Sequence, residues 1–304
     1  MISIVIPTYN GQSTIRELLD SLRKQTVLVD EIIVLDSESA DATLEIAAKA
    51  NCRTSTVLKN NFDHGATRNI GIEQAKGEFI IFLTQDVLPC DEYTIENIIK
   101  PFMEDIQIGA AFGRQVPYPN ASVFAEHLRL FNYPDTSYIR TLEDRKKYGI
   151  KTPFLSNSFA AYRRSVLEKI GYFKSGLIFG EDTCAAADML LKNQKIAYAA
   201  DAKVFHSHNY TIYQDFRRYF DMGVFHRNEN WLLREFSKAE GQGLKYIKSE
   251  IAFLMKQKRF DLFPEFVLRI LAKYIGYKLG KLYKHLPIGL CRSLSMNKSW
   301  WKKV

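Results

Sequence analysis

Residues 1–10 read MISIVIPTYN, residues 31–41 read EIIVLDSESAD, and residues 79–86 read FIIFLTQD. Each stretch is a short apolar run that gives way abruptly to polar residues. Segments with apolar residues at helical spacing separate these runs. Strands that alternate with helices predict a mostly parallel sheet covered on both faces. Because ligands bind at the carboxyl ends of such strands, we expect the chemistry just after residues 6, 35 and 83.

The rest of the chain falls into three stretches. Residues 118–152, with several prolines and aromatics, are predicted to form a partly helical insertion. A second α/β stretch follows, and beyond residue 211 the pattern is helical. The predicted organisation is a catalytic domain over 1–210, with halves 1–115 and 116–210, and a helical C-terminal region over 211–304.

The composition excludes several classes of protein. With 46% hydrophobic and 25% charged residues among 304, the chain is an ordinary globular protein. Its formal net charge of +8 arises beyond residue 263, where nine basic residues face one acidic residue, Glu265. A nucleic-acid partner is therefore disfavoured, because its binding charge should lie on the folded body. We expect no signal peptide, no membrane-spanning helix, and four reduced cysteines without metal spacing.

Five short motifs follow one another along the chain: Pro7-Thr8-Tyr9-Asn10, Asp36-Ser37-Glu38-Ser39-Ala40-Asp41, Arg68-Asn69, Thr84-Gln85-Asp86 and Gly180-Glu181-Asp182. Together they resemble the motifs of family 2 glycosyltransferases of the GT-A fold. Phe62-Asp63-His64-Gly65, followed by Thr67-Arg68-Asn69, is similar to bacterial rhamnosyltransferases that use dTDP-L-rhamnose. The resemblance implies a GT-A fold with a mostly parallel central sheet, a helical C-terminal extension, and transfer of a sugar from a nucleotide.

A donor nucleotide needs a carboxylate to accept hydrogen bonds from its base or ribose, and Asp36 ends a buried strand where it could do so. A turn-capping aspartate is the alternative interpretation. Arg68 is expected on the first turn of a helix, where it could meet a diphosphate, and a salt bridge is its alternative. The resemblance extends the donor-binding set to Thr8, Tyr9, Asn10, Glu38, Thr84, Gln85 and Asp86.

A divalent cation, Mg²⁺ or Mn²⁺, is the expected cofactor, because the diphosphate leaving group is anionic. Thr84-Gln85-Asp86 stands where the family usually has Asp-x-Asp, so Asp86 alone matches the metal ligand. His206 and His208 are candidate further ligands, since positions i and i+2 of an extended segment project to the same face. The family often places a metal-binding histidine here. A structural or acceptor-binding role is the alternative for this pair.

Asp182 is the predicted general base, which removes the proton of the acceptor hydroxyl as that oxygen attacks the anomeric carbon. It is expected to begin a helix whose dipole favours the ionised carboxylate, although a plain N-cap would look the same. Glu181 beside it is predicted to orient the acceptor or a loop. Arg217 and Arg218 are predicted near the donor diphosphate or the acceptor, with a charged helix face as the alternative.

The C-terminal region carries apolar residues at helical spacing from residue 263, with Arg269, Lys273, Lys281 and Lys284 on another side. Trp300-Trp301-Lys302-Lys303 adds aromatic residues next to cations. This pattern is typical of a basic amphipathic helix on an anionic membrane surface, and a core helix is the alternative. We therefore expect a cytoplasmic enzyme associated with the inner face of the cell membrane.

The predicted function is inverting transfer of L-rhamnose from dTDP-L-rhamnose to a cell-surface polysaccharide or a polyprenyl-linked glycan. A UDP-hexose donor is one alternative. A sugar-nucleotide-binding protein without turnover is another, although the presence of Asp86 and Asp182 argues against it. A nucleotidyltransferase would need a glycine-rich phosphate loop after the first strand, and Asn10-Gly11-Gln12-Ser13 is too poor in glycine.

Overall fold

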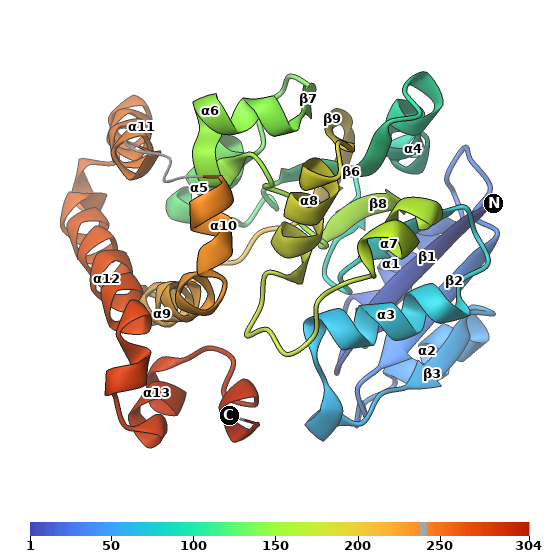
Figure 1. The fold of residues 1–304 in the computed structure, drawn as a ribbon, viewed down its shortest axis with the longest axis horizontal. Coiled ribbons are helices and arrows are strands. Elements are labelled where there is room, and N and C mark those ends of the chain that lie inside the picture. The colour runs from blue at the N-terminus through green and yellow to red at the C-terminus, as the bar shows by residue number, and fades with distance from the viewer. Residues whose placement is uncertain (237–241, 304) are drawn as a thin grey trace.

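The computed structural model describes residues 1–236 and 242–303 (Figure 1). Its N-terminal part alternates strands with helices, as predicted. The elements are β1 (Ile2–Thr8), α1 (Ile15–Leu22), β2 (Glu31–Asp36), α2 (Thr43–Lys49), β3 (Arg53–Thr56), α3 (His64–Gln74) and β4 (Phe79–Leu83). Every residue of β4 is buried, which explains its uniformly apolar sequence.

The strand ends meet where the sequence places the chemistry. β1 lies between β2 and β4 and runs parallel to both. Thr8, the last residue of β1, is paired with Asp36, the last residue of β2. The segments that follow these three strands therefore emerge at one edge of the sheet.

Beyond β4 the sheet is mixed. The elements are β5 (Leu88–Pro89), α4 (Thr94–Glu104), β6 (Ile108–Val116), α5 (Val123–Asn132), β7 (Tyr138–Arg140), α6 (Arg145–Tyr148), β8 (Phe159–Arg163), α7 (Arg164–Ile170), α8 (Glu181–Leu191) and β9 (Lys195–Phe205). The strand order is β3-β2-β1-β4-β8-β6-β9-β5, and β7 pairs with β9. β8 runs antiparallel to both β4 and β6. The partly helical insertion between β6 and β8 returns the chain to the edge at which β6 ends, so β8 runs back along β6.

From residue 212 onward, the described residues are mainly helical, as predicted. The helices are α9 (Ile212–Asn228), α10 (Asn230–Glu235), α11 (Gln242–Lys256), α12 (Phe263–Lys281) and α13 (Ile288–Leu294). The Thr211 hydroxyl accepts a hydrogen bond from the Gln214 N–H and so begins α9. Phe220 and Val224 of α9 belong to the same apolar core as Tyr162 of β8. The helical region thus packs on the α/β part, and the division into a catalytic domain over 1–210 and a helical region over 211–304 stays a prediction.

α12 packs along α9 in an orientation that the sequence did not reveal. A Cβ atom on Gly280 would collide with the carbonyl oxygen of Phe220, so the two backbones lie very close together. The face of α12 that meets the protein also buries Arg269 and Lys273. Arg269 binds the Asp215 carboxylate at 2.5 Å. The expectation that these two cations face a membrane is therefore wrong, because both are used inside the protein.

The outer side of α12 is apolar instead. Five of its side chains, about half exposed, form what we call the apolar face of α12: Val267, Leu268, Leu271, Tyr274 and Ile275. The tryptophans near the C-terminus do not join this face. Trp301 is only 4% exposed, and the Trp300 indole donates a hydrogen bond to the Gly176 carbonyl at 2.9 Å. Their predicted role as membrane-interface residues is wrong, because they anchor the C-terminal segment to the protein.

Candidate active site

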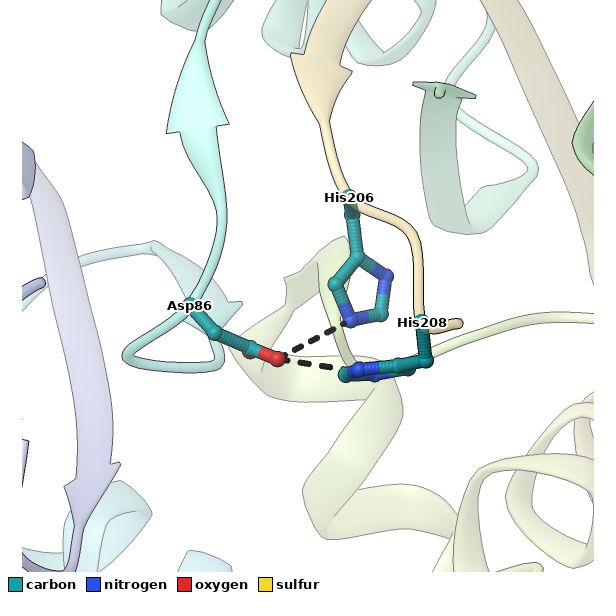
Figure 2. A group of neighbouring side chains, drawn as sticks. All are labelled: Asp86, His206 and His208. Carbon is teal, nitrogen blue, oxygen red and sulfur yellow. Dashed lines mark ion pairs between the residues drawn. The ribbon is translucent and has the colours of Figure 1, made fainter. Parts of the chain in front are cut away.

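Asp86, His206 and His208 form one cluster at the strand ends (Figure 2). Leu88 of β5 pairs with Phe205 of β9, which brings the loop after β4 beside the segment after β9. Asp86 Oδ2 lies 3.4 Å from His206 Nε2 and 3.5 Å from His208 Nε2. One ligand atom from each residue lies within 4.8 Å of the other two. A carboxylate and two imidazoles so arranged could share one divalent cation.

The protonation of this cluster suits a cation. Burial opposes ionisation of Asp86, but its contacts with the two histidines outweigh burial and hold its pKa well below the usual value. Burial lowers the pKa of His206. Burial and the neighbouring His206 lower the pKa of His208 to about 4. A carboxylate facing neutral imidazoles is the form that metal coordination requires.

Three residues that the sequence did not single out support the cluster. Gln115 of β6 accepts hydrogen bonds through Oε1 from His206 Nδ1 at 2.8 Å and from Arg129 at 2.6 Å. The Tyr118 hydroxyl donates to the Asp86 carbonyl at 3.2 Å. Gln115 is a polar residue near the end of a strand that begins with a largely apolar run, and this polar position was a usable signal. Nothing in the sequence around Arg129 or Tyr118 marks them.

Asp182 lies in the first turn of α8, as predicted, and its carboxylate is held by backbone groups. The N–H of Asn157 donates to Oδ2 at 3.1 Å, and the N–H of Thr183 donates to Oδ1 at 2.7 Å. Burial, followed by the negative charge of Glu181, raises the pKa of Asp182 to about 7. The helix dipole was expected to favour the ionised carboxylate, but burial and Glu181 outweigh it and raise the pKa. A carboxyl with a pKa near 7 remains well suited to accept a proton.

Glu181 and Arg68 form a buried ion pair, with Arg68 Nη1 3.0 Å from Glu181 Oε1. The Asn157 amide also donates to Glu181 Oε1 at 3.1 Å. Arg68 lies in the second turn of α3 rather than the first, and its side chain points into the protein. The pair joins α3 to the start of α8 and so positions Asp182. Direct contact of Arg68 with a diphosphate, or of Glu181 with an acceptor, stays a prediction.

Asp36 is fully buried and its carboxylate is used within the loop. The Thr8 hydroxyl donates to Oδ1 at 2.9 Å, and the Ser39 N–H donates to Oδ2 at 2.8 Å. These are the contacts of a turn-capping aspartate, which the sequence left open as the alternative. Thr8 and Asp36 therefore shape the loops around the donor edge, and their contact with a nucleotide stays a prediction.

The remaining predicted donor residues lie close to the same edge. The Gln85 amide exchanges two hydrogen bonds with the Tyr9 backbone, at 2.9 and 3.0 Å. Tyr9 is 41% exposed, and the Lys59 ammonium lies 4.4 Å from the centre of its ring. Asn10 and Glu38 adopt positive φ angles of 47° and 56° in the loops after β1 and β2. The Thr84 N–H donates to the Ser158 carbonyl at 3.2 Å.

The two arginines of α9 are placed differently from each other. Arg217 Nε donates to the carbonyl of Ser295 at 2.9 Å and so holds the C-terminal segment. Arg218 donates to the Tyr210 hydroxyl at 3.0 Å, and the Tyr210 ring lies 5.3 Å from the His208 ring. Arg218 is therefore the one of the two that lies beside the Asp86–histidine cluster.

Comparison with known proteins agrees with the class that this fold and site define. A family model described as Glycosyl transferase family 2 matches residues 3–171. The chain is 43% identical to the O-antigen chain rhamnosyltransferase RfbN of Salmonella typhimurium, over all of this chain and 96% of that protein. It is also 43% identical to the O-antigen chain rhamnosyltransferase WbaN of Salmonella anatum, over 99% of this chain and 96% of that one. The protein therefore belongs to glycosyl transferase family 2, and the prediction of a glycosyltransferase is confirmed.

Solved structures with the same fold confirm the GT-A prediction. The mannosyltransferase PcManGT of Pyrobaculum calidifontis, in complex with GDP-Man and Mn²⁺, superposes with a TM-score of 0.59 at 18% identity. The comparison covers 99% of this chain and 84% of that one. TarS 1–349 of S. aureus, in complex with UDP-GlcNAc, has a TM-score of 0.57 at 22% identity, over 97% of this chain and 84% of that one. At these identities the likeness concerns the fold alone.

Proposed function

We propose that this protein transfers L-rhamnose from dTDP-L-rhamnose, with inversion, to a growing cell-surface polysaccharide of the O-antigen type. The observation that carries the proposal is the 43% identity to two O-antigen chain rhamnosyltransferases along the entire chain. This identity extends through the helical C-terminal region, which the family 2 match does not include. Shared sequence in both parts supports a shared donor sugar and a shared class of acceptor.

In the proposed reaction, Asp182 accepts the proton of the acceptor hydroxyl. The acceptor oxygen forms its bond to the anomeric carbon while the bond from that carbon to the diphosphate breaks. Attack from the face opposite the diphosphate inverts the configuration at that carbon. The backbone N–H groups of Asn157 and Thr183 keep the carboxylate in one orientation for this step.

Asp86, His206 and His208 would hold a divalent cation, Mg²⁺ or Mn²⁺, which would neutralise the charge of the departing diphosphate. Arg218 contributes further positive charge on the same side, next to Tyr210 and His208. The test is Asp86→Ala, which should abolish cation-dependent donor binding in titration calorimetry. Unchanged turnover in excess EDTA would mean that arginines alone stabilise the leaving group.

Donor identity can be tested without knowing the acceptor. The exposed Tyr9 ring and the Thr8–Asp36 edge are the proposed nucleotide-binding surface. A ligand present at 100 times its Kd stabilises a protein by about 2.7 kcal/mol, which a thermal-unfolding screen detects easily. dTDP-L-rhamnose with Mn²⁺ should raise Tm more than UDP-glucose, UDP-galactose or GDP-mannose do. Stabilisation by a UDP-hexose and none by dTDP-L-rhamnose would favour the alternative donor.

We further propose that the helical region associates peripherally with the inner face of the cell membrane, where lipid-linked glycan acceptors are elongated. The support is the apolar face of α12, with the exposed cation Lys278 next to Tyr274 of that face. Within residues 1–236 and 242–303, no helix has both the length and the hydropathy to cross a bilayer. The double variant Leu268→Glu/Leu271→Glu should lose binding to anionic liposomes. Ile106→Glu, which changes an exposed apolar residue outside the helical region, is the matched control.

A further inference from the structure

We infer that Gln115 is a positioning residue that sets the orientation and tautomer of His206 and links this histidine to the loop that holds Asp182. The inference rests on the proposed metal site and goes beyond it, because Gln115 touches none of the reacting groups. Gln115 is only 1% exposed, and His206 is buried as well. Hydrogen bonds between them are therefore shielded from water and strongly orienting.

The orientation of the Gln115 amide is determined by its neighbours. Arg129 can only donate hydrogen bonds, and its Nη1 lies 2.6 Å from Gln115 Oε1. On the other side, Gln115 Nε2 donates to the Ser156 hydroxyl at 3.1 Å. A flipped amide would place its NH₂ group against the donor of Arg129. The oxygen of Gln115 must therefore be the atom that faces His206.

This orientation selects one tautomer of His206. Because Gln115 Oε1 can only accept, His206 Nδ1 must carry the proton in the 2.8 Å contact between them. The other ring nitrogen, Nε2, then keeps its lone pair in the neutral ring, and it points toward the Asp86 carboxylate (Figure 2). A cation placed between this nitrogen and the carboxylate would bind both of them. Gln115 thus prepares His206 as a ligand, as outer hydrogen-bond partners commonly do.

The amide nitrogen of Gln115 reaches the other half of the site through residues 156–158. Ser156 accepts from Gln115, the Asn157 N–H donates to Asp182, and the Ser158 carbonyl accepts from Thr84. This short loop therefore forms hydrogen bonds both with Thr84, two residues before Asp86, and with the proposed base, Asp182. A single buried amide therefore bonds both the proposed cation ligand and the loop that bonds the proposed base.

The test measures Mn²⁺ binding to the full chain by titration calorimetry, without turnover. Gln115→Leu removes the acceptor and should raise the Kd for Mn²⁺ about 10–100-fold. Gln115→Glu keeps an acceptor toward His206 and Arg129 and should stay close to the wild type. Ser156→Ala is the matched control, because it removes the hydroxyl that accepts from the Gln115 amide nitrogen and from the Ser158 N–H, leaves the Gln115–His206 bond in place, and should leave the Kd for Mn²⁺ unchanged.

A second measurement is independent of metal and of activity. In ¹⁵N-histidine-labelled protein without metal, the His206 ring should be protonated at Nδ1 in the wild type and in Gln115→Glu. In Gln115→Leu this preference should be lost. Equal Mn²⁺ affinity and an unchanged tautomer in Gln115→Leu would overturn the inference while the metal site stands, provided that His206→Ala weakens binding. No Mn²⁺ binding by the wild type would overturn both the metal site and the inference.

Discussion

Replacing Asp182 by asparagine should remove the pH dependence of turnover and stabilise the fold at alkaline pH. The pKa of Asp182 is raised from 3.8 to about 7 by burial and by the neighbouring Glu181. A shift of about three pH units corresponds to about 4 kcal/mol between the two protonation states. The folded protein binds this proton more tightly than the unfolded chain does. The stability that results is therefore fully present below about pH 4 and is lost as pH rises through 7.

Urea unfolding measures this effect directly. Asparagine has no proton to lose, so the unfolding free energy of Asp182→Asn, minus that of the wild type, should rise by about 4 kcal/mol between pH 4 and pH 8. One backbone N–H would face the asparagine NH₂ group and lose its acceptor. This loss lowers the unfolding free energy of the variant by about 1–3 kcal/mol at every pH, so the change of the difference with pH stays the same. Asp20→Asn, which makes the same substitution at an exposed carboxylate of α1, is the control.

Turnover supplies the second readout for the same residue. Wild-type kcat should fall about tenfold per pH unit below 7, because the protonated carboxyl cannot accept the acceptor proton. In Asp182→Asn, kcat should be about 10²–10⁴ lower and independent of pH, while donor affinity is retained. Near-normal turnover in that variant, or wild-type activity that stays constant down to pH 5, would refute the assignment of Asp182 as the base.

Three further perturbations test the framework of the site. Arg68→Met should lower the unfolding free energy, measured with urea, by about 3–5 kcal/mol, because Glu181 stays buried without its partner. The double variant Arg68→Met/Glu181→Gln should recover part of this unfolding free energy. Gly280→Val should lower Tm by several degrees, because its side chain collides with the α9 backbone, whereas Gly289→Ala, which meets open space, should not. A chain that ends after Leu294 should have a lower Tm and a lower turnover, because it lacks the buried Trp301 and the hydrogen bonds that residues 296 and 297 donate to Asp221. This shortened chain should still bind liposomes.

The convergence of Asp86, His206 and His208 was predicted from the spacing of the two histidines together with the resemblance to family 2 glycosyltransferases. The sequence could not reveal the partners of these residues. Gln115 and Asn157 act through strand neighbours, and the antiparallel β8 between β4 and β6 brings residues 156–158 to the site. Periodicity shows that a segment is a strand, but it does not specify the direction of that strand in the sheet.

The protonation of Asp182 shows how a local rule fails when a larger effect opposes it. A helix N-terminus stabilises a carboxylate by about 0.3–1 kcal/mol at an accessible site. The pKa of Asp182 is raised all the same, because burial and the charge of Glu181 outweigh this stabilisation. The position of the residue at the start of α8 was visible in the sequence. How far its side chain is buried depends on the packing of β8, α3 and α8, and the sequence did not show this.

The orientation of α12 changes the expected basis of membrane binding. The net charge beyond residue 263 suggested binding driven by cations, but Arg269 is paired with Asp215 and Lys273 is buried against the Tyr246 ring. Fewer cations can therefore meet lipid headgroups, while the apolar face of α12 is available to insert. Each surface cation adds about 1 kcal/mol that salt screens, whereas burial of apolar area is insensitive to moderate salt. Binding to anionic liposomes should persist in part at 0.5 M NaCl and vanish in Leu268→Glu/Leu271→Glu. Binding that salt abolishes but this double variant retains would show that cations outside the apolar face carry the attachment.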